Sequence, residues 1–179
     1  MELVEGTATV EDVDGFVERL AEIGDEHGVT VGAFDARYVV DRDHLARAVD
    51  LADRAIARGE NVADDRAIEI LCYAAGRRQI NRALRMGVSE GECPAVVLVD
   101  APPGDDDTGD ERDDDAEREQ AGADAVRSLS AFDPGETLGE YDGELVRDFF
   151  DVGEAELATV DGDLASLVHE RVALLVVEK

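Results

Sequence analysis

The chain has 179 residues and a formal net charge of -28 at pH 7, with 45 Asp and Glu against 17 Lys and Arg. This length suits one domain with one core, and a hydrophobic content of 44% is ordinary for a folded protein. The apolar periodicity along the chain argues against a disordered acidic protein. Lys179 is the only lysine, and many acids with almost no lysine are typical of a protein adapted to molar salt. We therefore expect the acidic coat to say little about function.

In the first half of the chain, short apolar runs that predict strands alternate with segments of helical periodicity. Aspartates and glycines mark the ends of the predicted helices. The predicted elements are a strand at 2–10, a helix at 12–27 that Gly28 ends, a strand at 29–34, a helix from Asp41 to Gly59, a helix capped by Asp64 or Asp65, and a strand at 95–99.

The segment 104–120 differs from the rest. From Asp105 to Glu119 most residues are acidic, and the only hydrophobic one is Ala116. Such a segment cannot bury a core. We predict a disordered acidic loop inserted into one domain that spans residues 1–179. A role as an acidic mimic of nucleic acid is the alternative.

Beyond this segment the spacing predicts helices at 121–132 and 142–150, and a last element capped by Asp163. Residues 172–177 fit the end of a helix or a strand, and periodicity does not separate the two. A fourth strand is compatible with the pattern. The fold class is α/β: a single domain with a small mixed or antiparallel sheet, built from residues near 2–8, 30–35 and 95–99 and covered by helices.

The twenty residues from Ile70 to Ser89 contain no acid. At this composition a random window of that length is acid-free with a probability of roughly 0.003. The window also holds four arginines: Arg77, Arg78, Arg82 and Arg85. The segment without acidic residues is thus also a segment in which arginines are concentrated.

If Gln79 to Met86 is helical, Arg78, Arg82 and Arg85 share one exposed face, and Ile80, Ala83 and Leu84 project into the core. At molar salt the Debye length is about 3 Å, so phosphate recognition must use short bidentate contacts, which Arg makes and Lys does not. We predict an RNA-binding surface, and the alternative is that acids brought in by folding neutralise it. Its residues are Arg77, Arg78, Gln79, Arg82 and Arg85.

Signals for catalysis are lacking. The sequence has no GxSxG, Walker, HExxH or dinucleotide-binding motif, and carboxylates are too frequent for any pair to be informative. Cys72 and Cys93 lack zinc-site or disulfide spacing, so we expect buried reduced thiols. We predict no enzyme activity, no catalytic residue, no metal and no cofactor. With no signal peptide and no stretch that could span a bilayer, we expect a cytoplasmic protein without a membrane partner.

The stretch IEILCYAAGRRQINRALRMG (68–87) resembles the hallmark of a known family, the small tRNA-recruiting, kinase-binding subunits of the KEOPS complex. That hallmark is E-x-L-L-Y-x-[AS]-G-x-R-Q-I, followed by a basic helix and a Gly. The stretches 33–55 and 163–179 resemble the family's first conserved strand and helix and its LVxERVALL ending. The matching residues of the hallmark are Glu69, Leu71, Tyr73, Ala75, Gly76, Arg78, Gln79, Ile80 and Gly87.

The resemblance implies a non-catalytic subunit that binds the acceptor tail of tRNA. It also implies that the subunit binds and stimulates the kinase/ATPase subunit of the complex and contacts other KEOPS subunits indirectly. The complex makes threonylcarbamoyladenosine next to the anticodon. We expect the kinase-binding surface on the C-terminal element, which has more apolar positions than one helix face can bury. The alternative is that these positions all pack inside. The residues of the predicted surface are Leu164, Leu167, Val168, Val172 and Leu175.

Two other functions stay open. One is a purely structural protein-docking adaptor without RNA binding, its arginines neutralised within the fold. The other is an enzyme or binding protein for a phosphorylated metabolite, which would need a deep pocket beside the arginines.

Overall fold

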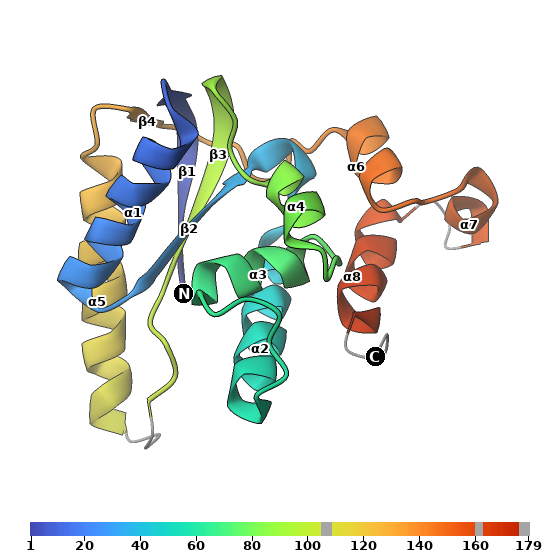
Figure 1. Ribbon diagram of the computed structural model, residues 1–179. Helices are drawn as coiled ribbons and strands as arrows, with labels where there is room; N and C mark the ends of the chain where they lie inside the picture. Colours follow the sequence, from blue (N-terminus) through green and yellow to red (C-terminus); the bar gives the residue numbers. More distant parts are fainter. Residues whose placement is uncertain (105–108, 160–162, 176–179) are drawn as a thin grey trace. The chain divides into compact units, whose positions relative to one another are not determined.

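The computed structural model describes residues 1–104, 109–159 and 163–175. It consists of two compact units (Figure 1). The first unit combines Met1–Asp35 with Val88–Thr137, and the second combines Ala36–Gly87 with Leu138–Lys179. The α/β class is confirmed, with the strands in the first unit and most helices in the second.

The sheet of the first unit is antiparallel, which decides between the two predicted kinds of sheet. Its strand order is β2-β3-β1-β4. The central strand β3 carries the continuous apolar run at 95–99, which is fully buried, as expected of a strand covered on both faces. The strands are β1 (Glu2–Val10), β2 (Thr30–Asp35), β3 (Gly91–Asp100) and β4 (Phe132–Pro134).

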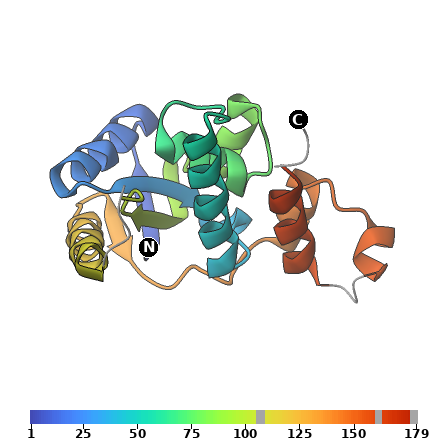
Figure 2. The same cartoon turned by 90° about the horizontal axis from the view of Figure 1, so that it is seen from below.

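Two helices, α1 (Val13–His27) and α5 (Gly109–Arg127), pack against this sheet and against each other (Figures 1 and 2). Asp12 caps α1 by accepting a hydrogen bond from the Gly15 N–H at 2.8 Å, and Gly28 ends it in the left-handed conformation. Both ends of this helix are therefore where the sequence predicts them. Among the described residues, none of the helices is both long and apolar enough to cross a membrane.

Helix α5 corrects the prediction of a disordered loop at 104–120. Residues 105–108 lie outside the described part, but from Gly109 the segment is helical. Residues 119, 122, 123 and 126 form one buried stripe at helical spacing. The buried Glu119 carboxylate accepts hydrogen bonds from the Met1 ammonium group at 2.5 Å and from the Ala101 N–H at 3.0 Å. An acidic residue thus anchors the helix. The helix ends at Arg127 rather than at 132, where β4 begins.

The second unit is built from helices. Aspartates cap four of them through their side chains: Asp41, Asp65, Asp142 and Asp163. The α-helices are α2 (Arg42–Arg58), α3 (Arg66–Ala74), α4 (Ile80–Ala83), α6 (Gly143–Phe149), α7 (Glu154–Thr159) and α8 (Leu164–Leu174), and the 3-10 helices are η1 (Ala36–Tyr38) and η2 (Leu84–Met86).

Helix α8 corrects the predicted partner surface. The five residues predicted for kinase contact are core residues of this chain, exposed by at most 7% of their surface, because helical spacing directs them to one packed side. They cannot form a free docking surface. The C-terminal element is helical up to Leu174, and residues 176–177 lie outside the described part. The five buried residues are Leu164, Leu167, Val168, Val172 and Leu175.

Candidate nucleic-acid interface

The arginine segment (residues 77–86) begins where α3 is brought to an end. Gly76 has φ of 58°, a conformation that glycine adopts without strain. The Gly76 N–H donates to the Tyr73 carbonyl, and the Arg77 N–H donates to the Cys72 carbonyl, each at 3.0 Å. This is the hydrogen-bond pattern of a Schellman motif. The chain therefore leaves the axis of α3, and Arg77 to Gln79 are not helical.

The continuous arginine helix predicted for 79–86 is wrong in its geometry. Helix α4 has four residues and passes into the 3-10 helix η2, and Arg78 precedes both. Arg78, Arg82 and Arg85 therefore do not share the face of one regular helix. The turn at Gly76 and the change of helix type reset the directions in which these side chains leave the backbone.

Three sides of the segment α4–η2 differ in character. Ala83 and Met86 are fully buried. Ile80 and Leu84, which were predicted to point into the core, are 37% and 52% exposed. Arg82 and Arg85 are exposed as well. At 100° to 120° per residue, the apolar pair and the cationic pair lie about 100° or more apart around the axis.

Arg82 and Arg85 remain available to a partner. In residues 1–104, 109–159 and 163–175, no acid lies within ion-pair distance of Arg78, Arg82 or Arg85. The Arg85 guanidinium lies over the Phe149 ring, 5.7 Å from its centroid, which orients the side chain and leaves its N–H groups free to donate. Gln79 is exposed, and its side chain makes no cap hydrogen bond to α4.

Arg77, in contrast, is occupied within the fold. Its Nη2 donates to the Phe149 carbonyl at 2.6 Å and to the Asp151 carboxylate at 2.8 Å. The guanidinium also lies 5.8 Å from the Phe149 ring centroid. Folding therefore neutralises the charge of Arg77, which is the alternative stated for the predicted RNA-binding residues. Arg77 is thus not part of the candidate interface.

Arg78 turns toward a small cavity of about 100 Å³. Two arginines of α2 line the same cavity, Arg54 and Arg58. Sequence reasoning missed both because each stands among acids along the chain, and only the packing of α2 against α3 brings them to Arg78. The other lining residues are Leu51, Ala55, Glu60 and Tyr73.

A buried carboxylate holds the loop in front of α3. Glu69 is fully buried, and its Oε2 accepts hydrogen bonds from the N–H groups of Val62 and Ala63 at 2.9 and 2.8 Å. Burial, followed by the charge of Glu69, raises the pKa of the Cys72 thiol to about 11. Both cysteines are buried thiols that are not part of a disulfide, as predicted, and a protonated Cys72 is not a nucleophile.

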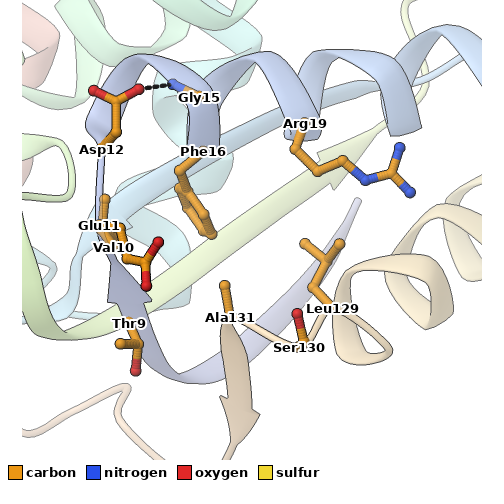
Figure 3. Close-up of a pocket in the computed structure, with 10 residues that line it drawn as sticks. All are labelled: Thr9, Val10, Glu11, Asp12, Gly15, Phe16, Arg19, Leu129, Ser130 and Ala131. Carbon is orange, nitrogen blue, oxygen red and sulfur yellow. Dashed lines mark hydrogen bonds between the residues drawn. The ribbon is translucent and has the colours of Figure 1, made fainter.

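A larger cavity, of about 620 Å³, lies in the first unit between the start of α1 and the segment at 129–131 (Figure 3). Two of its three charged lining residues, Asp12 and Arg19, are engaged locally. Asp12 caps α1, shown by the dashed line to Gly15 in Figure 3, and Arg19 pairs with Glu22 at 2.7 Å. Among the described residues, no group of His, Cys, Asp or Glu is arranged to hold a metal ion.

Comparison with known proteins assigns the chain to a family. No curated protein matches the chain. A family model described as "Kinase binding protein CGI-121" matches residues 10–175, which includes the arginine segment and nearly all elements of both units. The chain therefore belongs to the CGI-121 family of kinase-binding proteins.

Proposed function

We propose that this protein is a non-catalytic subunit of the KEOPS complex that binds tRNA through its acceptor tail and binds and stimulates the kinase/ATPase subunit. Family membership supports a kinase-binding regulatory role. The tRNA half of the proposal rests on the arginine segment and on its resemblance to the hallmark of tRNA-recruiting subunits. In this role the protein supports threonylcarbamoyladenosine formation next to the anticodon.

The observation that carries RNA binding is the pair Arg82 and Arg85. Both are exposed and have no acidic partner in the described parts of the chain, although the protein has a net charge of -28. Two arginines of the first unit, in contrast, are paired locally, Arg19 with Glu22 and Arg127 with Asp124. A polyanion supplies the missing negative charge through charge-assisted hydrogen bonds to the guanidinium groups.

Ile80 and Leu84 are the better candidates for kinase contact. The five apolar residues of the C-terminal element that were predicted for kinase contact are buried, so we place the docking surface elsewhere. Ile80 and Leu84 lie one helical turn apart on the same side of the segment, and exposed apolar neighbours of this kind mark protein interfaces. Because they lie on a different side from Arg82 and Arg85, one subunit can hold the kinase and the RNA together.

A matched pair of charge reversals tests the RNA half. The variant R82E/R85E removes both free arginines, and R19E/R127E makes the same change in charge at two paired arginines of the first unit. Binding to tRNA with and without its acceptor tail is measured at molar KCl by fluorescence anisotropy. Each lost charge-assisted hydrogen bond is worth about 1.5–3 kcal/mol, so R82E/R85E should bind at least about a hundredfold more weakly.

The control should bind tRNA within about threefold of the wild type, because exposed ion pairs contribute about 0–1 kcal/mol and lie outside the proposed interface. Circular dichroism confirms that both variants fold. Equal affinities of the two variants would contradict RNA binding by the arginine segment. If both still bind the kinase, that result would favour a structural adaptor without RNA binding.

A further inference from the structure

The cavity beside Arg78 has a lining that suits an anion. Leu51, Arg54, Ala55 and Arg58 follow one another at the spacing of a single face of α2, and this face lines the cavity opposite Tyr73 and Arg78. Three arginines from two separate segments thus line about 100 Å³ of space. Arg82 and Arg85 do not line it, so it is distinct from the exposed surface of α4–η2.

Arginines outnumber carboxylates among the residues that line the cavity. Glu60 is the one carboxylate among its lining residues. Arg54 also pairs with Asp50 at 2.9 Å, whereas Arg58 and Arg78 have no acid within ion-pair distance in the described parts. Like charges gathered in a partly enclosed space repel one another, so a bound anion would stabilise this arrangement.

Tyr73 adds an uncharged donor. Burial and then the charges of Glu69 and Glu60 raise the pKa of Tyr73, while Arg78 and Arg58 act in the opposite direction. Its hydroxyl therefore stays protonated near neutral pH and can donate a hydrogen bond. The donors come from three directions: α2, α3 and the turn after Gly76.

We propose that this cavity is a binding site for one phosphoryl group of a nucleotide, either free or within an RNA chain. Donors that converge from several directions suit the tetrahedral oxygens of a phosphoryl group better than a planar carboxylate, which a single bidentate arginine can satisfy. Two or more arginines and a hydroxyl around one small space are the usual composition of a phosphate site.

Capping of α2 alone does not explain the site. Arg58 lies in the last turn of α2, where a cation interacts favourably with the helix dipole. That interaction requires neither Arg78 nor the Tyr73 hydroxyl, which lie outside α2. If capping were the whole role of these residues, Y73F would change no binding property.

The test measures AMP, adenosine and a short RNA ending in the tRNA acceptor tail by isothermal titration calorimetry at constant ionic strength. The variants are R58Q, which removes one charge, and Y73F, which removes only the hydroxyl. R47Q is the matched control, because Arg47 is an exposed arginine of α2 that does not line the cavity. Adenosine lacks the phosphoryl group and should not bind.

If the source is a free nucleotide, AMP binds, and R58Q weakens this binding about tenfold or more, as expected for one lost charge-assisted hydrogen bond. If the source is RNA, AMP binds no better than adenosine, but R58Q and Y73F weaken RNA binding relative to R47Q. Unchanged binding of both ligands in R58Q and Y73F would overturn the proposal. R82E/R85E acts at a different surface, so its result decides the proposed RNA binding of α4–η2 separately.

Discussion

At the scale of single residues, His44 shows how a polar group is accommodated in the core of the second unit. It is fully buried, and its Nδ1 accepts from the Val40 N–H at 3.4 Å. Its Nε2 lies 2.8 Å from the Ala74 carbonyl and must therefore carry the proton and donate it. The neutral ring thus joins the start of α2 to the end of α3, directly before the turn at Gly76.

This arrangement predicts a loss of stability in mild acid. Burial, the largest cause, lowers the pKa of His44 from 6.5 to about 4. Because the unfolded state takes up a proton at higher pH than the folded state, stability is complete above about pH 7 and falls as the pH drops toward 4. Between about pH 7.5 and about pH 5.5 the free energy of unfolding should fall by about 1 kcal/mol.

Urea unfolding across this pH range provides the measurement. H44Q should be less stable than the wild type at neutral pH, yet its stability should change less with pH. H27Q, which replaces a half-buried histidine of α1, is the matched control and should keep the wild-type slope. A slope that H44Q leaves unchanged would show that other groups cause the pH dependence.

Residue chemistry also explains which predictions succeeded. Asp41, Asp163 and one of Asp64 and Asp65 were predicted as helix caps, and Asp41, Asp65 and Asp163 each accept a backbone N–H three residues along the chain. Such contacts depend only on neighbouring residues, so the sequence reveals them. The function of Glu119 could not be predicted in this way, because its partners Met1 and Ala101 lie on other segments.

At the scale of elements, the segment α4–η2 presents two exposed surfaces of different chemistry. We predict that L84D weakens kinase binding about tenfold or more, because burial of a leucine contributes about 1.5–3 kcal/mol and an aspartate would be desolvated at the interface. Binding to the kinase/ATPase subunit is measured by biolayer interferometry at molar KCl.

V17D is the control for this experiment. Val17 is 46% exposed on α1, so the change is of the same kind at an apolar position of the first unit, and kinase binding should be retained. L84D should also retain tRNA binding. If the kinase affinity of L84D equals that of V17D, the docking surface does not include Leu84.

Helical periodicity alone could not show how these surfaces arise. The apolar and basic spacing at 79–86 is compatible with one regular helix, and the prediction followed it. The structure instead uses a four-residue helix and a 3-10 turn, set at an angle by the turn at Gly76. The candidate phosphate site could not be predicted from the sequence, because Arg58 and Arg78 come together only when α2 packs on α3.

At the scale of the whole molecule, the net charge of -28 opposes compaction. We expect the melting temperature to fall markedly when KCl is lowered from molar concentration to about 0.1 M, because the screening length then rises from about 3 Å to about 10 Å. RNA binding should persist at salt concentrations that dissociate lysine-rich RNA-binding proteins, since bidentate arginine contacts are short and directional.

Thermal melts and tRNA titrations across a KCl series check both statements. A parallel series in sucrose separates charge screening from the general effect of excluded cosolutes. A melting temperature that is independent of KCl would contradict the adaptation to molar salt that the composition indicates.

The interactions of Arg77 have a consequence for how mutational scans of this protein are interpreted. Arg77 binds the last carbonyl of α6 and the Asp151 carboxylate, and Arg171 donates to the next carbonyl, that of Phe150, at 3.2 Å. An alanine at position 77 would loosen the connection between the turn after α3 and the end of α6. RNA affinity would then drop without any lost RNA contact. A ranking of the arginines by affinity alone would thus mistake a structural residue for a recognition residue.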